Sequence, residues 1–213
     1  MTGFTHLHTH SYYSFLEGLP APGELVQASV ENGMRALALT DRVSLSGAIE
    51  FYTASKTAGI QPIIGLQVPV TSPLEIQPLV GDLVLLAQDL AGWRSLCRIS
   101  STVQTNPVNN PNQVLRFSLL AEETDGLLCL TAGSQGCFDQ LVSMNQTDTA
   151  QRYLEHLTDI FPNQLYVELQ RRTPLEATLS RQLSSLAAQT SVPVVATNQV
   201  YYLDDNQAGL QKL

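Results

Sequence analysis

Three of the four histidines in this 213-residue chain stand at alternate positions near its beginning, at His6, His8 and His10. In an extended strand alternate side chains point the same way, so the three imidazoles would line one face and Leu7 and Thr9 the other. Imidazoles spaced about 7 Å apart at a strand end can converge on one or two divalent ions. The alternative is a set of hydrogen-bonded histidines without a metal, because histidine is also common in buried polar networks.

Short apolar runs typical of buried parallel strands alternate with helical patterns along the chain. The sequence predicts seven strands, at 4–8, 35–40, 62–70, 83–87, 126–131, 164–169 and 193–197. It predicts helices near 22–32, 46–58, 89–103, 147–160 and 174–190. Repeated strand–helix units favour a parallel sheet, and without a glycine-rich GxGxxG turn they favour an α/β barrel of the (β/α)7 TIM-like kind. In such barrels functional side chains gather at the carboxyl ends of the strands.

The composition is that of a globular protein, with 44% hydrophobic and 14% charged residues. A net charge of −8 argues against direct DNA binding by this segment, because an acidic surface repels the phosphate backbone. The three cysteines have no CxxC spacing, and Cys97 and Cys129 fit buried thiols in a reducing compartment. No signal peptide and no apolar run of about 20 residues stands out. We therefore expect one cytoplasmic domain over 1–213 that does not enter a membrane.

Six motifs, in order along about 200 residues, resemble the N-terminal polymerase-and-histidinol-phosphatase (PHP) domain of bacterial DNA polymerase III alpha subunits. They are HLHTHSYYSFLEG at 6–18, ALALTD at 36–41 with GAIEFY at 47–52, AGIQPIIG at 58–65, LVLLA at 83–87, YVELQR at 166–171 and VATN at 195–198. The resemblance implies a distorted seven-stranded α/β barrel, in agreement with the strand count. It also implies up to three divalent ions, held by histidines, carboxylates and sometimes a cysteine, that activate water against a phosphoester.

Most of the ligand positions that the resemblance implies are substituted here. His8, His10 and Glu17 stand where ligands belong and could hold one Zn, Mn or Mg ion weakly, as a vestige of the site. At the other positions stand residues that bind hard cations poorly or carry a positive charge themselves. They are Arg42, Gln67, Gly133, Gln199 and Tyr201, with Asp82 as one further candidate ligand. We therefore expect no catalytic residues and no cofactor beyond such an ion.

Arg42 suggests what replaces the ions. A guanidinium can supply positive charge and several donors to a group of carboxylates, so we expect Arg42 to pair with Glu17 or Asp82. The alternative is an exposed arginine on the loop after the second strand. Glu168 is expected to have a structural role, with a hydrogen bond near Arg171 or Arg172.

Three functions remain open at this stage. The resemblance implies a non-catalytic domain of a DNA-directed DNA polymerase in DNA replication or repair synthesis. Its partners would be the polymerase body in the same chain and a proofreading exonuclease. The second is a metal-dependent phosphoesterase, either a 3′–5′ exonuclease or a small phosphatase. The third is a free-standing interaction module.

Overall fold

The fold is seen in a computed structural model, which describes residues 3–74, 79–105, 110, 112–171 and 176–209. The strands are β1 (Ala36–Leu39), β2 (Gln61–Thr71), β3 (Val80–Ala87), β4 (Leu127–Leu130), β5 (Leu165–Leu169) and β6 (Val194–Ala196). The α-helices are α1 (Pro22–Glu31), α2 (Ala48–Ala58), α3 (Leu90–Gln104), α4 (Phe117–Ala121), α5 (Cys137–Ser143), α6 (Thr147–Ile160) and α7 (Ala177–Gln189). Two short 3-10 turns are η1 (Gly133–Gln135) and η3 (Asp205–Gln207). Six of the seven predicted strands and all five predicted helices are confirmed.

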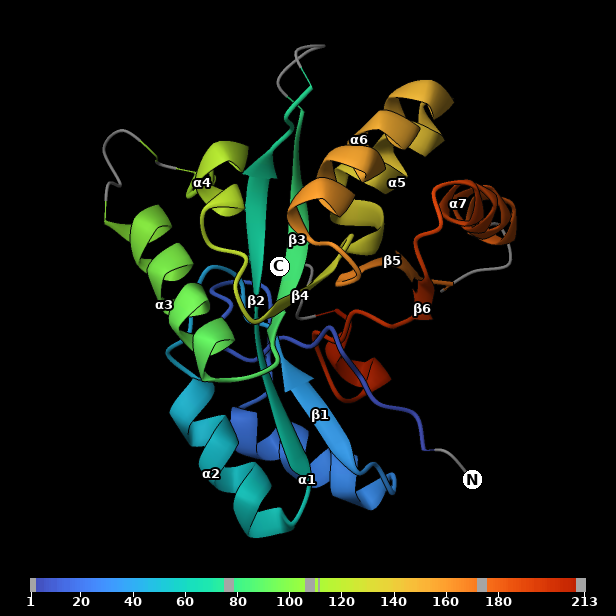
Figure 1. The fold of residues 1–213 in the computed structure, drawn as a ribbon. Helices are drawn as coiled ribbons and strands as arrows, with labels where there is room; N and C mark the ends of the chain where they lie inside the picture. Colours follow the sequence, from blue (N-terminus) through green and yellow to red (C-terminus); the bar gives the residue numbers. More distant parts are fainter. Residues whose placement is uncertain (1–2, 75–78, 106–109, 111, 172–175, 210–213) are drawn as a thin grey trace.

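The strands form one curled sheet in the order β1-β2-β3-β4-β5-β6 (Figure 1). The prediction of a parallel sheet is wrong for one strand, because β3 runs antiparallel to both β2 and β4. Only residues 72–79 separate β2 from β3, and this is too short for the helical crossover that a parallel pair needs. The other neighbouring pairs are parallel.

The predicted strand over 4–8 is wrong, since residues 4–8 form no regular strand. The segment nevertheless lies beside β1, where Ala38 N donates to His6 O at 2.9 Å and Thr40 N donates to Thr9 O at 2.8 Å. On its other side Val200 N donates to His8 O at 3.1 Å. Residues 6–10 therefore bridge the first strand and the segment that follows the last one.

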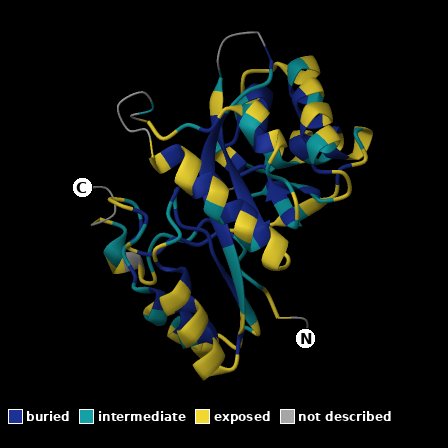
Figure 2. Ribbon diagram, turned by 60° about the vertical axis from the view of Figure 1, so that its left-hand side comes forward, coloured by how far each residue is buried: buried dark blue, intermediate teal, exposed yellow. Residues whose placement is uncertain are grey.

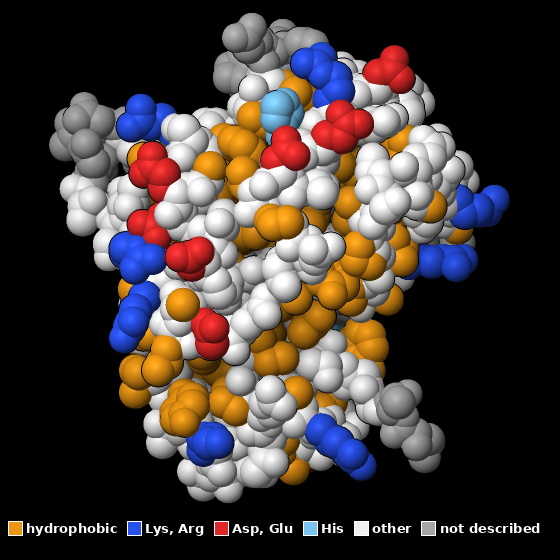
Figure 3. Space-filling view, in the orientation of Figure 1, with side chains coloured by type: hydrophobic (Ala, Val, Ile, Leu, Met, Phe, Trp, Pro, Cys, Tyr) orange, Lys and Arg blue, Asp and Glu red, His pale blue; other side chains and the backbone are white. Residues whose placement is uncertain are grey.

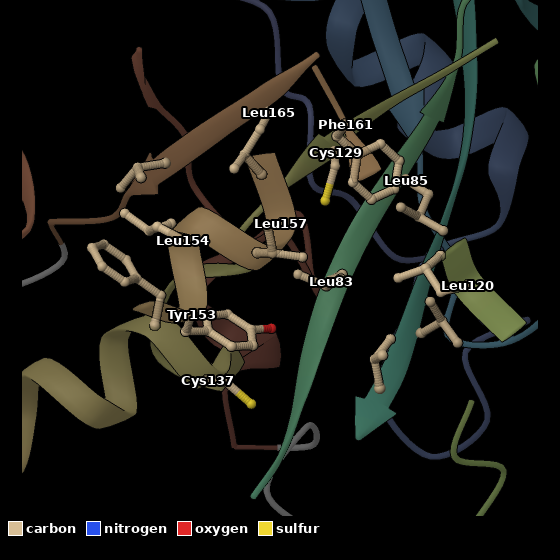
Figure 4. Close-up of a cluster of buried hydrophobic side chains, with 14 of the residues drawn as sticks. Leu83, Leu85, Leu120, Cys129, Cys137, Tyr153, Leu154, Leu157, Phe161 and Leu165 are labelled. Atoms are coloured by element: carbon tan, nitrogen blue, oxygen red, sulfur yellow. The ribbon is translucent and has the colours of Figure 1, made fainter. Parts of the chain in front are cut away.

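Inward-facing and outward-facing side chains alternate along the strands, as a pleated sheet requires. On the outer face of the sheet a large apolar core joins β3 to α3, α5, α6 and α7. Figure 4 shows part of this core, with Tyr153, Leu154 and Leu157 of α6 beside β3, the strand that carries Leu83 and Leu85. Most residues of β3 and β4 and of the second half of β2 are buried, while the outer faces of the helices are exposed (Figure 2). Strand β6 is itself largely exposed.

Of the two cysteines predicted to be buried, Cys129 is fully buried in this core and Cys97 is only half-buried, since it lies toward the side of α3. Among the described residues, no helix combines the length and the apolar character needed to cross a membrane.

Candidate functional site

Polar side chains from distant parts of the sequence meet inside one end of the curled sheet, which we call the polar end. Arg42, Gln135 and Gln199 follow the carboxyl ends of β1, β4 and β6, and Gln67 and Glu168 lie in the later parts of β2 and β5. Asp82 comes from the beginning of the reversed strand β3. The side chains that make up the polar end are His8, His10, Glu17, Arg42, Gln67, Asp82, Gln135, Glu168, Gln199 and Tyr201.

The centre of the polar end is a fully buried pair formed by His8 and Glu168. The His8 Nδ1 and Glu168 Oε1 atoms are 2.8 Å apart, and the other ring nitrogen lies 2.6 Å from Gln67 Oε1. Burial by itself lowers the pKa of His8, but the Glu168 charge and the two hydrogen bonds outweigh it and the pKa is raised. Burial would raise the pKa of Glu168, but the His8 charge and three hydrogen bonds hold it below its usual value. Because each ring nitrogen faces an acceptor and the pKa is raised, the arrangement favours a protonated His8 that donates to both Glu168 and Gln67, although Gln199 Nε2 also lies 3.3 Å from His8 Nε2.

Three glutamines connect this pair to the other side of the polar end. Gln67 Nε2 donates to Asp82 Oδ2 and, at 2.6 Å, to Gln135 Oε1. Gln199 Nε2 donates to Gln67 Oε1 at 3.3 Å and to Gln135 Oε1 at 3.2 Å, and Gln135 Nε2 donates to the Tyr201 hydroxyl at 3.1 Å. Each amide has both a donor and an acceptor, so the network can satisfy buried groups of either kind without an ion.

Arg42 supplies positive charge to the polar end. Its Nη1 donates to Asp82 Oδ2, and its Nε lies 3.5 Å from Glu17 Oε1. The expected pairing with Glu17 or Asp82 is therefore confirmed for both carboxylates. The Arg42 side chain is 31% exposed, so it lies at the boundary between the buried network and solvent.

Three buried atoms of the polar end have no hydrogen-bond partner within the described part of the chain, His10 Nε2, Glu17 Oε2 and Glu168 Oε2. Burial lowers the pKa of His10 well below its usual value, and the His8 and Arg42 charges lower it further. His10 therefore stays neutral; its Nδ1 lies 2.9 Å from Ser14 Oγ, and its ring stacks on Tyr201 at 4.6 Å. Burial raises the pKa of Glu17, although the Arg42 charge opposes this.

Asp41 fastens the loop that follows the histidines. One carboxylate oxygen accepts from Ser11 N and Ser14 Oγ and the other from Ser11 Oγ, each at 2.7 Å. Ser14 Oγ also accepts from Arg42 N at 3.0 Å. This clamp fixes both the loop that carries Glu17 and the backbone from which Arg42 extends.

The prediction that three histidines share one face is wrong for His6. His6 and Thr9 line a separate hollow of about 240 Å3 between α1 and residues 198–203. Leu7 packs with the apolar residues inside the sheet, on the side to which His8 also points. Two consecutive inward side chains break the strict alternation, as they do in a β-bulge, and this separates His6 from His8 and His10.

Sequence reasoning missed two residues of the polar end. Glu168 was expected near Arg171 or Arg172, the second of which lies outside the described residues, but it faces inward and pairs with His8. Its position two residues beyond Tyr166 on an alternating strand could have indicated this direction. Gln135 lies on η1, two residues beyond Gly133, and only the turn geometry brings it inward. At Gly133 itself a Cβ atom would stand 2.6 Å from the end of the Gln170 side chain, and φ is +55°, so a larger residue would require Gln170 to move and would strain the backbone.

The profile of the PHP domain family matches residues 6–172. The chain belongs to this family. Curated relatives of this PHP domain are DNA polymerase III alpha subunits. The one from Caulobacter vibrioides is 36% identical over 205 residues, and the one from Bacillus subtilis is 34% identical over 203 residues. Each alignment covers 94% of this chain and 18% of the relative, so the chain spans about a fifth of their length.

Two solved structures share the fold of this PHP domain. An amidohydrolase from Chromobacterium violaceum, solved with bound sulfate, has a TM-score of 0.56 at 13% identity and covers 92% of this chain and 87% of its own. A Bifidobacterium adolescentis protein provisionally described as a metal-dependent phosphoesterase has a TM-score of 0.52 at 14% identity. The match covers 93% of this chain and 87% of that protein. At such low identity these likenesses concern the fold alone.

The residues of the polar end do not fit the multinuclear metal cluster that the resemblance implies. Both ring nitrogens of His8 already donate, and the Arg42 guanidinium stands between two carboxylates that a metal would need. Gln67 and Gln199 offer neutral oxygens, which bind hard cations more weakly than carboxylates. Within the described ranges, no group of three or more His, Cys, Asp or Glu side chains is arranged to hold an ion.

Proposed function

We propose that this chain is the PHP domain of a bacterial DNA polymerase III alpha subunit and that it acts there as a structural and interaction module. The observation that carries the proposal is the hydrogen-bonded network of the polar end, in which Arg42, Gln67 and Gln199 stand at ligand positions that the resemblance implies and Gln135 connects the two glutamines. The relatives named above support the polymerase assignment. The polar end then contributes stability to the parent polymerase instead of phosphoester hydrolysis.

Several finer features belong to the same proposal. Residues 1–213 form one domain, and the segment over 6–10 takes the place of the seventh strand in a distorted seven-stranded barrel; its hydrogen bonds to Ala38, Thr40 and Val200 support this. The polymerase body in the same chain is the main partner, a proofreading exonuclease is a second one, and the parent protein is cytoplasmic. The net charge of −8 supports the absence of direct DNA binding by this domain.

The test of this function uses the coding sequence beyond Leu213 and the protein that it encodes. We expect the frame to continue into a polymerase that extends a primed DNA template, with the extension rate unchanged when Glu17→Gln or His10→Gln is introduced and the protein remains folded. A frame that ends at this domain, or a longer protein without primer extension, would contradict the proposal.

A metal-dependent phosphoesterase with a reduced site is the second candidate, and one observation favours it. His10 Nε2 and Glu17 Oε2 are buried and free of hydrogen bonds in the described part of the chain, so they could accept one Zn, Mn or Mg ion beside His8. Elemental analysis of the purified chain and hydrolysis of bis-p-nitrophenyl phosphate, with and without EDTA, decide this. Stoichiometric metal together with EDTA-sensitive turnover would establish the second candidate over the first.

A further inference from the structure

The inward-facing side chains change character from one end of the sheet to the other. On β5 Tyr166 is followed two residues later by Glu168, and on β2 Ile63 is followed four residues later by Gln67. At the end opposite to the polar end, the inward positions carry apolar side chains. They are Leu7, Ile63, Leu86, Leu128, Tyr166 and Val195, which we call the apolar end. These residues line a hollow of about 350 Å3 and, apart from Leu86, are only partly buried.

A second hollow lies on the outer side of the same strand ends, between α2 and α3. It has a volume of about 500 Å3 and shares Pro62, Ala87 and Gln88 with the first. Its rim carries large apolar side chains that face solvent, with exposed fractions of 71% for Ile49 and 72% for Leu90. Figure 3 shows hydrophobic side chains gathered around the lower end of α3 and α2 and across the middle of this view, with charged side chains mostly around the edge.

The chemistry of these two hollows restricts what can cover them. Among the described residues that line them there is no Lys or Arg, and the Lys56 ammonium beside the face lies 5.9 Å from the centre of the Tyr52 ring, so a phosphate backbone finds little counter-charge there. The only carboxylate is that of Asp89, and it is already engaged in capping Ala91 N and Gly92 N at the start of α3. A contiguous apolar surface that spans two hollows is typical of a protein contact site.

We propose that the apolar end, together with Ile49, Tyr52 and Leu90, is the face through which this domain packs against the rest of a polymerase chain. This inference rests on the proposed function. In the Caulobacter vibrioides relative the matched stretch is 18% of the chain, which leaves 82% (100 minus 18) outside it. Since the polar end is closed by its own network, the uncharged apolar face is the surface that a large neighbouring body can bury at the lowest desolvation cost.

The test uses the longer polymerase chain that carries this domain, beside the 213-residue chain. The double substitution Ile49→Lys and Leu90→Glu puts charge on the face at solvent-exposed positions. We expect the melting midpoint of the longer chain to fall by about 3 °C or more and a protease to cleave sooner next to the domain, while the 213-residue chain melts as before. The matched control is Val30→Lys with Met144→Glu, two exposed apolar residues away from the face, and it should leave both chains unchanged.

Two results would overturn this inference. In one, the face and control variants affect the longer chain equally. In the other, the 213-residue chain sediments as a dimer that Ile49→Lys with Leu90→Glu dissociates, which would assign the face to a second copy. Failure of the proposed function has a different signature, because the unsubstituted longer chain would then fail to extend a primer whatever the melting data show.

Discussion

The inward-facing positions at the two ends of the curled sheet carry opposite kinds of side chain. At the polar end, carboxylates, imidazoles and amides are buried together, and the network of His8, Arg42 and three glutamines satisfies nearly all of them. At the apolar end, the corresponding positions carry apolar side chains that are left half-buried. Buried charged and polar groups need partners within the chain itself, because leaving them unpaired is costly. An exposed apolar surface, in contrast, can be buried later by another protein surface.

The largest expected effect tests whether the polar end depends on its central pair. Glu168→Ala leaves the His8 imidazolium buried without its carboxylate, so we expect a loss of about 3–5 kcal/mol in the free energy of unfolding. Urea denaturation followed by circular dichroism measures it. Glu155→Ala on the exposed side of α6 serves as the control and should change stability by less than about 0.5 kcal/mol. Equal losses in both variants would show that the pair is not central to the polar end.

The next effect concerns the positive charge at the rim. Arg42→Ala leaves Asp82 and Glu17 side by side without their counter-charge, and we expect a loss of about 2 kcal/mol in the same measurement. Arg98→Ala is the matched control, because Arg98 is half exposed and pairs with Glu123 at the surface. Exposed pairs contribute about 0–1 kcal/mol, so the two arginines should differ clearly. If Arg42→Ala costs no more than Arg98→Ala, the polar end does not need the guanidinium.

Asp139 lies outside the polar end but is affected by the Glu168 charge, and it offers a pH-dependent test of the pKa shift that a buried carboxyl acquires there. It is buried on α5, its Oδ1 has no hydrogen-bond partner in the described residues, and burial with the Glu168 charge raises its pKa to about 8. The folded chain therefore holds a proton that the unfolded chain has already released, and the stability contributed by this group is lost as the pH rises from about 4 to about 8.

Asp139→Asn removes this dependence. We expect the variant to match the original chain near pH 4 and to exceed it by at least about 1 kcal/mol at pH 8.5, since one pKa unit corresponds to about 1.4 kcal/mol. Thermal unfolding across this pH range measures the difference. A difference that stays constant with pH would mean that Asp139 is ionised throughout.

The smallest effect concerns Ile49, on the rim of the second hollow next to the apolar end. In the 213-residue chain, Ile49→Lys should change the free energy of unfolding by less than about 0.5 kcal/mol, because the side chain is 71% exposed and buries little on folding. Urea denaturation of the isolated chain measures it. A loss of about 2 kcal/mol or more would show that this face contributes to the fold of the domain itself and would remove the contrast between the two ends.

Sequence reasoning reached most of the strands because each is a short apolar run bounded by turn residues, as in LVLLA at 83–87. The sequence also predicted that Arg42 and Gln67 replace metal ligands, because Arg42 follows the motif at 36–41 and Gln67 follows the motif at 58–65. It could not give the reversal of β3, which depends on a connection and not on the strand's own residues. Nor could it pair His8 with Glu168, since 160 residues separate them and only the closure of the sheet brings them together.

Local backbone conformation explains the remaining differences. The expected convergence of His6 with the other two histidines fails because the alternation breaks between Leu7 and His8. Gln135 enters the polar end through a turn in which Ala132 and Gly133 both have left-handed backbones, with φ of 61° and 55°. Alanine is rarely found in this conformation, so no local propensity predicts it.

The Arg42 side chain has a consequence for how the domain is made. A cation that is part of the polypeptide is present in every copy from the moment of synthesis, in fixed ratio, and no chelator can withdraw it. Under the proposed function, a domain stabilised by this guanidinium would mature independently of the supply of trace elements in the cell. What it gives up is the open coordination position through which a bound metal would act on a substrate.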